Sequence, residues 1–343
     1  MPSRRAFLQA AGAAAVGMAG ASQAGAPTGK NAVTPKYGGA HEMPTNLTLL
    51  SLQNADGAET LGVKLEGDAV LDVRRASRIL GIAAPLTLEE LLREGHPQAL
   101  HRLIAAAQTS AHAAVVPESS LSFGRLFTHP GKIVCIGLNY RAHAQEAHAK
   151  LPSVPILFNK YNNALAAHNC TISLPPRDVA YKFDYETELL IVIGKTARNV
   201  SEADALNYVA GYCTAHDFSA RDLQLETPSG QWMIGKTLDG FGPIGPYFVS
   251  ADRVGDPNSL KIETHVNGEQ RQSSNTSFMI FNPQKLIAYI SRMWTLEPGD
   301  IIWSGTPEGV ILGYPKEKQV WLKAGDEIVS TIEKLGSLRF NLA

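Results

Sequence analysis

The chain has 343 residues, of which 44% are hydrophobic and 18% charged, a composition that predicts a globular protein with a full-sized core. Its 31 Lys and Arg against 32 Asp and Glu give a net charge of -1, which argues against nucleic acid as a partner. The three cysteines, Cys135, Cys170 and Cys213, include no pair at CxxC spacing, which excludes a disulfide framework and a four-thiolate zinc site. A metal ion would therefore be held by oxygen or imidazole ligands.

The first residues combine Arg4-Arg5 with an Ala- and Gly-rich apolar run to Ala21, and no acidic residue occurs before Glu42. The run resembles a twin-arginine export signal, and it is shorter than the roughly 18 to 20 residues that span a bilayer. We therefore expect a signal peptide over residues 1–26 and a mature N-terminus near residue 25. The folded protein would reach the periplasm through the twin-arginine export machinery. An N-terminal amphipathic helix is the alternative.

A small α+β domain is expected over residues 46–125, after a solvated Pro- and Gly-containing linker over 27–45. Thr87 and Glu90 stand at the spacing of a helix N-terminal capping box, ahead of an apolar face. The predicted strands of this domain cover 47–53, 58–65 and 69–73, and the predicted helices begin at Thr87 and cover 97–110.

The remaining residues, 126–343, are expected to form a larger, strand-rich domain. Asn267-Gly268 between two alternating runs predicts a type I′ hairpin. The predicted strands cover 132–136, 186–193, 208–216, 260–266, 300–304 and 326–333, and the helices follow Asn139, begin at Ser201 and cover Pro283 to Met293. Strands and helices do not alternate strictly, which argues against a Rossmann or TIM fold.

Gly240, Gly242 and Gly245 form a GxGxxG pattern, the spacing of a dinucleotide-binding loop. Pro243 and Pro246 interrupt this segment, and no helical pattern follows to hold a pyrophosphate at its N-terminus. The pattern therefore does not predict a dinucleotide site.

Two carboxylates, Glu186 and Glu188, stand at the start of the apolar run that ends at Gly194. The two-residue period of a strand places both on one face, beside a run that must be largely buried. Buried like charges repel and lose hydration, so they require a compensating cation, and a divalent ion with oxygen ligands provides one. The alternative is that both side chains reach solvent at a strand edge.

The next predicted strand ends at His216-Asp217, which places a third carboxylate at a strand end. His216 points to the opposite face from Asp217 and is interpreted as a packed histidine rather than a ligand. Arg221 begins a turn or short helix, where it either pairs with Asp222 or orients the acidic ligands.

These segments are similar, in the same order, to the motifs of the fumarylacetoacetate hydrolase family. The resemblance extends from about Pro130 to Leu342, over half the chain. It is carried by Lys132–His143, Asp184–Gly194, Asp217–Gln224, Gly235-Lys236, Leu296–Asp300 and Ser304–Pro307. It implies an α+β fold in which 126–343 form the family's mixed β-roll catalytic domain.

The resemblance also implies the roles of individual residues. Glu186, Glu188 and Asp217 would bind Mg²⁺ or Mn²⁺, with Ca²⁺ as an alternative ion. Lys236 corresponds to the family's active-site lysine, whose ammonium would stabilise developing negative charge. Gln224, Thr306 and Arg221 would contact or orient the substrate.

His143 and Glu146 stand three residues apart, a spacing that brings both to one helix face. In relatives with this arrangement the pair lies on a lid over the substrate, and the carboxylate polarises the imidazole so that it activates water. A solvated helix face is the alternative. Phe158–Asn163 departs from the family's Lys-Pro-x-Ser/Thr segment and keeps only Lys160, so contacts to the substrate tail do not carry over.

The resemblance implies a metal-dependent hydrolase that cleaves a C–C bond in a 2,4-dioxo acid of the acylpyruvate or fumarylpyruvate type, through an enolate held on the metal. An oxaloacetate-type decarboxylase and a 2-hydroxymuconate-type isomerase or hydratase would use the same site. A periplasmic protein that binds 2-oxo acids without turnover is a further alternative. Relatives commonly pair, so we expect a homodimer.

Overall fold

The computed structural model describes residues 41–110, 112–228 and 230–343. The expected signal peptide and all but the last residues of the expected linker lie outside this range. At its beginning, the backbone N–H of Glu42 donates to the carbonyl of Gly95, 2.8 Å away. None of the helices in the described part combines the length and the apolarity that a membrane crossing requires.

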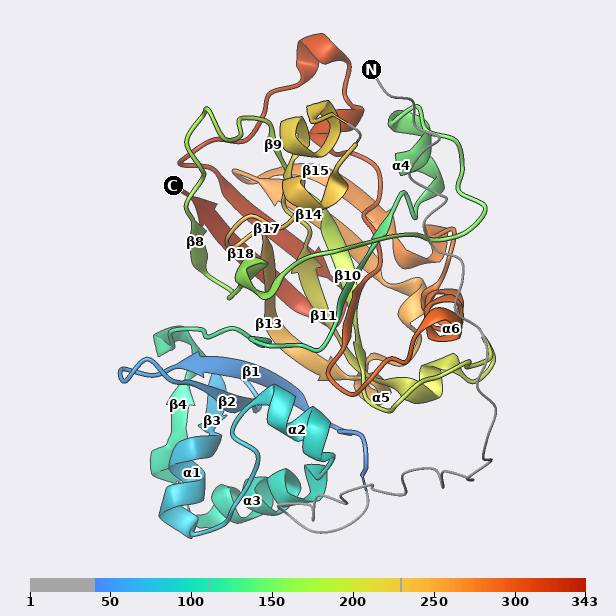
Figure 1. Cartoon of the computed structure of the whole chain (residues 1–343). Coiled ribbons are helices and arrows are strands. Elements are labelled where there is room, and N and C mark those ends of the chain that lie inside the picture. The colour runs from blue at the N-terminus through green and yellow to red at the C-terminus, as the bar shows by residue number, and fades with distance from the viewer. Residues whose placement is uncertain (1–40, 111, 229) are drawn as a thin grey trace, which may run out of the picture. The chain divides into compact units, whose positions relative to one another are not determined.

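The fold is mixed α+β, as the sequence predicts, and it is built around two large sheets (Figure 1). The larger sheet contains, in spatial order, β4 (Val115–Pro117), β3 (Ala69–Asp72), β2 (Glu59–Lys64), β1 (Thr48–Gln53), β13 (Gly242–Ser250), β11 (Val209–His216), β10 (Thr187–Ile193), β16 (Ile301–Trp303), β5 (Ile133–Gly137) and β6 (Ile156–Asn159), and β7 (Leu165–Ala166) pairs with β13.

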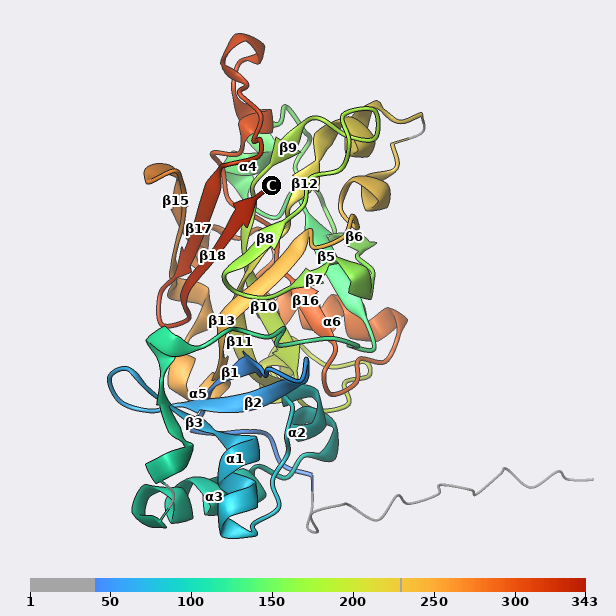
Figure 2. The ribbon, with the colours of Figure 1, turned by 90° about the vertical axis from the view of Figure 1, so that its left-hand side faces the viewer.

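The second sheet packs against the first through β14, β17 and β18, which contact β10, β11 and β13 (Figure 2). Its spatial order is β15 (Glu269–Asn275), β14 (Lys261–Val266), β17 (Glu327–Ile332), β18 (Gly336–Leu342) and β8 (Cys170–Ile172). A two-stranded sheet joins β12 (Ser219–Ala220) to β9 (Phe183–Asp184). The helices are α1 (Val73–Leu80), α2 (Leu88–Glu94), α3 (Pro97–Ser110), α4 (Arg141–Glu146), α5 (Ala251–Val254) and α6 (Pro283–Met293).

Strand β10 is buried on both faces, and its side chains divide the core in two. Leu190 and Val192 belong to the core cluster that includes residues of α2 and α3, whereas Leu189 and Ile191 belong to the cluster that includes residues of α6 and the second sheet. Glu188 has the parity of Leu190, so its carboxylate lies on the face opposite the second sheet.

Strand β1 pairs antiparallel with β13, with Thr48 opposite Val249 and Leu49 opposite Phe248. The strands before residue 118 therefore extend the same sheet that carries β10 and β11. The division into domains at residue 126 stays a prediction.

Several local predictions are confirmed. Thr87 accepts a hydrogen bond from Glu90 N at 3.0 Å and caps α2. Asn267 and Gly268 have φ values of +51° and +81°, as a type I′ turn requires.

Other local predictions are wrong. The helix expected from Ser201 is a single 3-10 turn, Ala205–Tyr208. Strand β13 and helix α1 were not predicted. The prolines and glycines of β13 hide its strand pattern, and only Val73 and Ala76 of α1 are buried, which leaves that helix without an evident apolar stripe.

Replacing His168 with glutamine is expected to weaken the acid sensitivity of the fold. Burial, and secondarily the Arg339 guanidinium, lowers the pKa of His168 to about 4, although Glu118 opposes the shift. The unfolded chain takes up a proton near pH 6.5 and the folded chain does not, so stability falls as the pH drops from 6.5 towards 4. The loss is on the order of 3 kcal/mol. Urea unfolding at pH 7 and pH 4.5 would show a smaller difference for His168→Gln than for wild type.

His112→Gln, the same substitution at an exposed histidine, is the matched control. Equal pH dependence of His168→Gln and wild type would show that His168 does not titrate as described.

Candidate active site

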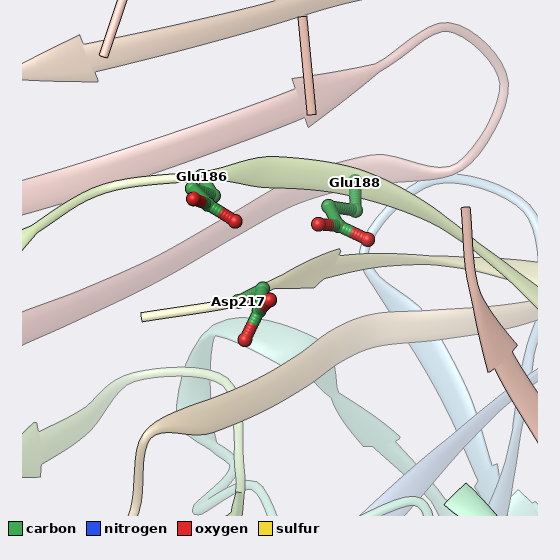
Figure 3. Close-up of side chains that lie close together, drawn as sticks. All are labelled: Glu186, Glu188 and Asp217. Carbon is green, nitrogen blue, oxygen red and sulfur yellow. The ribbon is translucent and has the colours of Figure 1, made fainter. Parts of the chain in front are cut away.

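The three predicted metal ligands lie together at the adjoining ends of β10 and β11. Glu188 is the second residue of β10, Glu186 is the residue before that strand, and Asp217 is the residue after β11. The backbone N–H of Asp217 donates to the carbonyl of Glu186 at 2.9 Å, which holds the two strand ends side by side. One oxygen from each carboxylate lies within 4.8 Å of the others, and all three residues are at most 5% exposed (Figure 3).

Three buried cations surround this acidic cluster. Lys236 Nζ donates to Glu186 Oε2 at 2.7 Å and to Asp217 Oδ2 at 2.8 Å. Arg221 Nη2 lies 2.7 Å from Glu186 Oε1, and Lys160 Nζ lies 2.6 Å from Asp217 Oδ1. Lys236, whose ammonium was expected near the metal, therefore contacts two of the proposed ligands directly.

The charges of the cluster are unevenly compensated. Burial raises the pKa of Glu186, but the Lys236 ammonium and the Arg221 guanidinium outweigh it and hold that pKa below its usual range. The pKa of Glu188 is raised well above its usual range by burial and by the neighbouring Asp217 and Glu186 carboxylates. Glu188 is therefore the carboxylate that lacks a compensating charge.

The donor set fits a hard divalent cation. Glu188 accepts a hydrogen bond from Gly305 N at 2.7 Å and forms no ion pair with the residues that the structure describes. Asp217 Oδ1, although close to Lys160, accepts no aligned hydrogen bond within the described chain. A cation that prefers oxygen ligands would compensate the charge of Glu188 and coordinate Asp217 Oδ1. The three carboxylates are therefore suited to hold Mg²⁺ or Mn²⁺.

The predicted dyad lies on α4, which follows a tight turn after β5. Leu138 adopts φ +54°, a left-handed conformation that costs energy for leucine. Asn139 holds the turn: its Nδ2 donates to the carbonyls of Phe281 at 2.9 Å and Ser304 at 2.7 Å. The chain is thereby turned from β5 into α4.

His143 and Glu146 contact each other as their spacing predicts. His143 Nδ1 lies 2.8 Å from Glu146 Oε1, and Gly309 N donates to Glu146 Oε2 at 2.9 Å. An ionised carboxylate can only accept, so in the neutral imidazole Nδ1 carries the proton and Nε2 has a lone pair that can act as a base.

A cavity of about 1080 Å³ connects the dyad to the acidic cluster. Seven of the nine predicted site residues line it, whereas Glu188 and Asp217 are buried and are not among its lining residues. The seven are His143, Glu146, Glu186, Arg221, Gln224, Lys236 and Thr306, and aromatic side chains, among them Phe158, Trp232, Tyr314 and Trp321, complete the lining.

The three predicted substrate-contacting residues also have partners within the protein. Arg221 Nη1 donates to Gln224 Oε1 at 2.9 Å. The Thr306 hydroxyl donates to the carbonyl of Thr187 at 3.0 Å and accepts from Gln272 Nε2 at 2.9 Å. Their side chains are thus fixed before a substrate arrives.

His216 is a packed residue, as predicted. It accepts a hydrogen bond from Glu186 N at its Nε2 atom, 3.0 Å away, and its Nδ1 lies 2.8 Å from Ser330 Oγ. Burial lowers its pKa to about 3, so the imidazole is neutral and fixes the backbone of Glu186.

Sequence reasoning did not assign roles to Lys160, Asp184 or Gln272. All three are buried and contact predicted site residues. Gln272 lies on β15, remote in sequence from the site, and no local pattern indicates it. Lys160 follows Asn159 in a polar segment, and no local pattern indicates that its side chain is buried.

Residues 132–343 match the model of the fumarylacetoacetate (FAA) hydrolase C-terminal family. The match covers more than half of the chain, in the range where the acidic cluster, the dyad and the cavity lie. The chain belongs to the fumarylacetoacetate hydrolase family.

Among curated relatives, a fumarylacetoacetate hydrolase domain-containing protein 2 homolog of Dictyostelium discoideum is 49% identical over 222 residues, 62% of this chain and 72% of the relative. The mitochondrial oxaloacetate tautomerase Fahd2a of Rattus norvegicus is 42% identical over 254 residues, 74% of this chain and 79% of the relative. A solved fumarylacetoacetate hydrolase from Exiguobacterium antarcticum is 30% identical, with a TM-score of 0.69, over 86% of this chain and 99% of that structure.

Proposed function

We propose that this protein is a divalent-metal-dependent enzyme that interconverts the enol and keto forms of oxaloacetate or of a closely related 2-oxo diacid. One observation carries the proposal: the His143–Glu146 dyad and Glu186 of the acidic cluster line a single cavity, so a base and a metal held by the cluster would face one substrate. The similarity to an oxaloacetate tautomerase supports tautomerisation among the reactions that such a site could catalyse.

A metal ion held by Glu186, Glu188 and Asp217 would supply positive charge that withdraws electrons from the 2-oxo group. Lys236 and Arg221 keep Glu186 ionised for that purpose. The guanidinium of Arg221 and the amide of Gln224, which line the cavity, provide donors for a substrate carboxylate.

The proton transfer is assigned to the dyad. His143 Nε2 removes the proton from the enol hydroxyl, the oxygen becomes the keto group as the double bond electrons move to C3, and the imidazolium returns the proton to C3. Glu146 accepts from Nδ1 throughout and stabilises the imidazolium while it carries both protons.

Hydrolysis of a C–C bond in an acylpyruvate is the second candidate, and the size of the cavity favours it. About 1080 Å³ with aromatic lining exceeds what a four-carbon diacid fills, and a substrate with an acyl tail would use that space. His143 would then activate water for attack on the distal carbonyl, and cleavage would give a carboxylic acid and pyruvate.

Enzyme assayed with Mg²⁺ is expected to accelerate the loss of enol absorbance of fresh oxaloacetate, and to lose that activity in EDTA until Mg²⁺ is restored. Parallel assays with acetylpyruvate and fumarylpyruvate would follow pyruvate release. Pyruvate release from these substrates without enol–keto conversion of oxaloacetate would favour the hydrolase instead. Tight binding of all three acids without turnover would refute both enzymatic proposals.

Export through the twin-arginine machinery, a periplasmic location and a homodimeric state remain predictions from the sequence. Sedimentation of the purified protein at micromolar concentration measures the last of these directly.

A further inference from the structure

Asp184, at the end of β9, connects the acidic cluster to the loop that follows β16. Its Oδ2 accepts from Arg221 Nε at 2.8 Å, and Arg221 in turn contacts Glu186. On its other side, Asp184 accepts backbone N–H groups of Ile311 at 2.8 Å and Leu312 at 3.0 Å. The side chain is fully buried, so these bonds are shielded from competing water.

Tyr185, the next residue, holds the same loop at a second point. Its hydroxyl donates to the carbonyl of Gly309 at 2.8 Å. The N–H of Gly309 donates to Glu146 Oε2, and Glu146 Oε1 contacts His143. Asp184 and Tyr185 thus fix the loop whose backbone holds the dyad carboxylate.

The loop over residues 309–313 is packed so tightly that its backbone has little room to move. Gly309 has φ +100°, and a Cβ there would lie 2.4 Å from the carbonyl oxygen of Arg271. A Cβ on Gly313 would lie 2.4 Å from the carboxyl carbon of Glu146. The loop therefore packs directly on Glu146, and a displacement of the loop would displace the carboxylate.

We infer that Asp184 and Tyr185 are positioning residues that fix the 309–313 loop and thereby hold Glu146, and through it His143, in register with the acidic cluster. Neither residue needs to touch the substrate. The kinetic part of this inference rests on the proposed function, whereas the structural part concerns the dyad of the free protein.

The kinetic test uses Asp184→Asn and Tyr185→Phe, each in the wild-type and the Glu146→Gln backgrounds. Tyr185→Phe removes the hydroxyl that bonds Gly309 O and Tyr314 Oη and should lower kcat about fivefold. Asp184→Asn weakens bonds to a charged acceptor and should lower kcat about 10- to 100-fold. In the Glu146→Gln background Tyr185→Phe should cost less than about twofold, because it acts through that carboxylate. Tyr208→Phe, the same chemical change on a half-buried tyrosine in the 3-10 turn Ala205–Tyr208, is the control.

The second test needs no substrate. In protein labelled with ¹⁵N-histidine, the His143 Nδ1 resonance should shift in Asp184→Asn and Tyr185→Phe, and stay unchanged in Tyr208→Phe. Tyr185→Phe keeps the Asp184–Arg221 pair and is expected to fold even if Asp184→Asn does not.

An unchanged His143 resonance in Tyr185→Phe, or equal kcat losses in both backgrounds, would overturn the inference. If the wild-type protein converts none of the 2-oxo acids tested, the proposed function fails, and the resonance measurement still decides whether the two residues position the dyad.

Discussion

Replacing Glu188 with alanine is expected to abolish Mg²⁺ binding and to lower turnover by at least about 10³-fold, since a catalytic metal contributes several kcal/mol. Glu188 is the carboxylate whose charge no described side chain pairs, so its loss removes a ligand without breaking an ion pair. Titration calorimetry with Mg²⁺ and steady-state rates measure the two effects. The control is Glu202→Ala, which removes an exposed carboxylate away from the site.

Thermal unfolding gives an independent measurement of the same loss. Mg²⁺ at 100 times its Kd should stabilise the wild-type protein by about 2.7 kcal/mol and leave Glu188→Ala unaffected. Unchanged Mg²⁺ affinity in Glu188→Ala would show that the three carboxylates do not form the metal site.

Replacing Glu146 with glutamine is expected to lower kcat by about 10²- to 10⁴-fold, the usual contribution of general acid–base catalysis. The substitution keeps the shape of the side chain and removes the charge that stabilises the His143 imidazolium. The acidic cluster is untouched, so calorimetry should show wild-type affinities for Mg²⁺ and for oxalate, a small mimic of a 2-oxo acid.

Gln145 is exposed on the same helix, so Gln145→Ala tests whether any change to α4 reduces the rate. Full activity of Glu146→Gln would remove the dyad from the mechanism. Loss of Mg²⁺ binding in that variant would instead indicate that α4 supports the metal site.

The sequence contains the main elements of the site because their patterns are local. Glu186 and Glu188 stand two residues apart at the start of an apolar run, and this spacing alone places both carboxylates on one face of a buried strand. The spacing of His143 and Glu146 likewise predicts their contact on a helix. The motif order then supplies Asp217, which periodicity places only at a strand end.

What the sequence does not contain is the pairing between distant segments. Lys160 contacts Asp217, 57 positions later in the chain, because the end of β6 lies beside the acidic cluster. From the sequence alone, a lysine in a polar segment would be expected on the surface. Gln272 reaches Thr306 only because the second sheet packs on the first. Such contacts follow from the topology, which no window of residues determines.

The pairing of β1 with β13 also determines where the chain can be divided. A fragment beginning at residue 126 would keep all nine proposed site residues but would leave β13 without β1, its partner at Phe248 and Val249. Exposed backbone donors and acceptors on an apolar strand invite pairing between molecules. A shortened gene product would therefore be prone to aggregate, although none of the described residues that it lacks, 41–110 and 112–125, lines the cavity beside the acidic cluster.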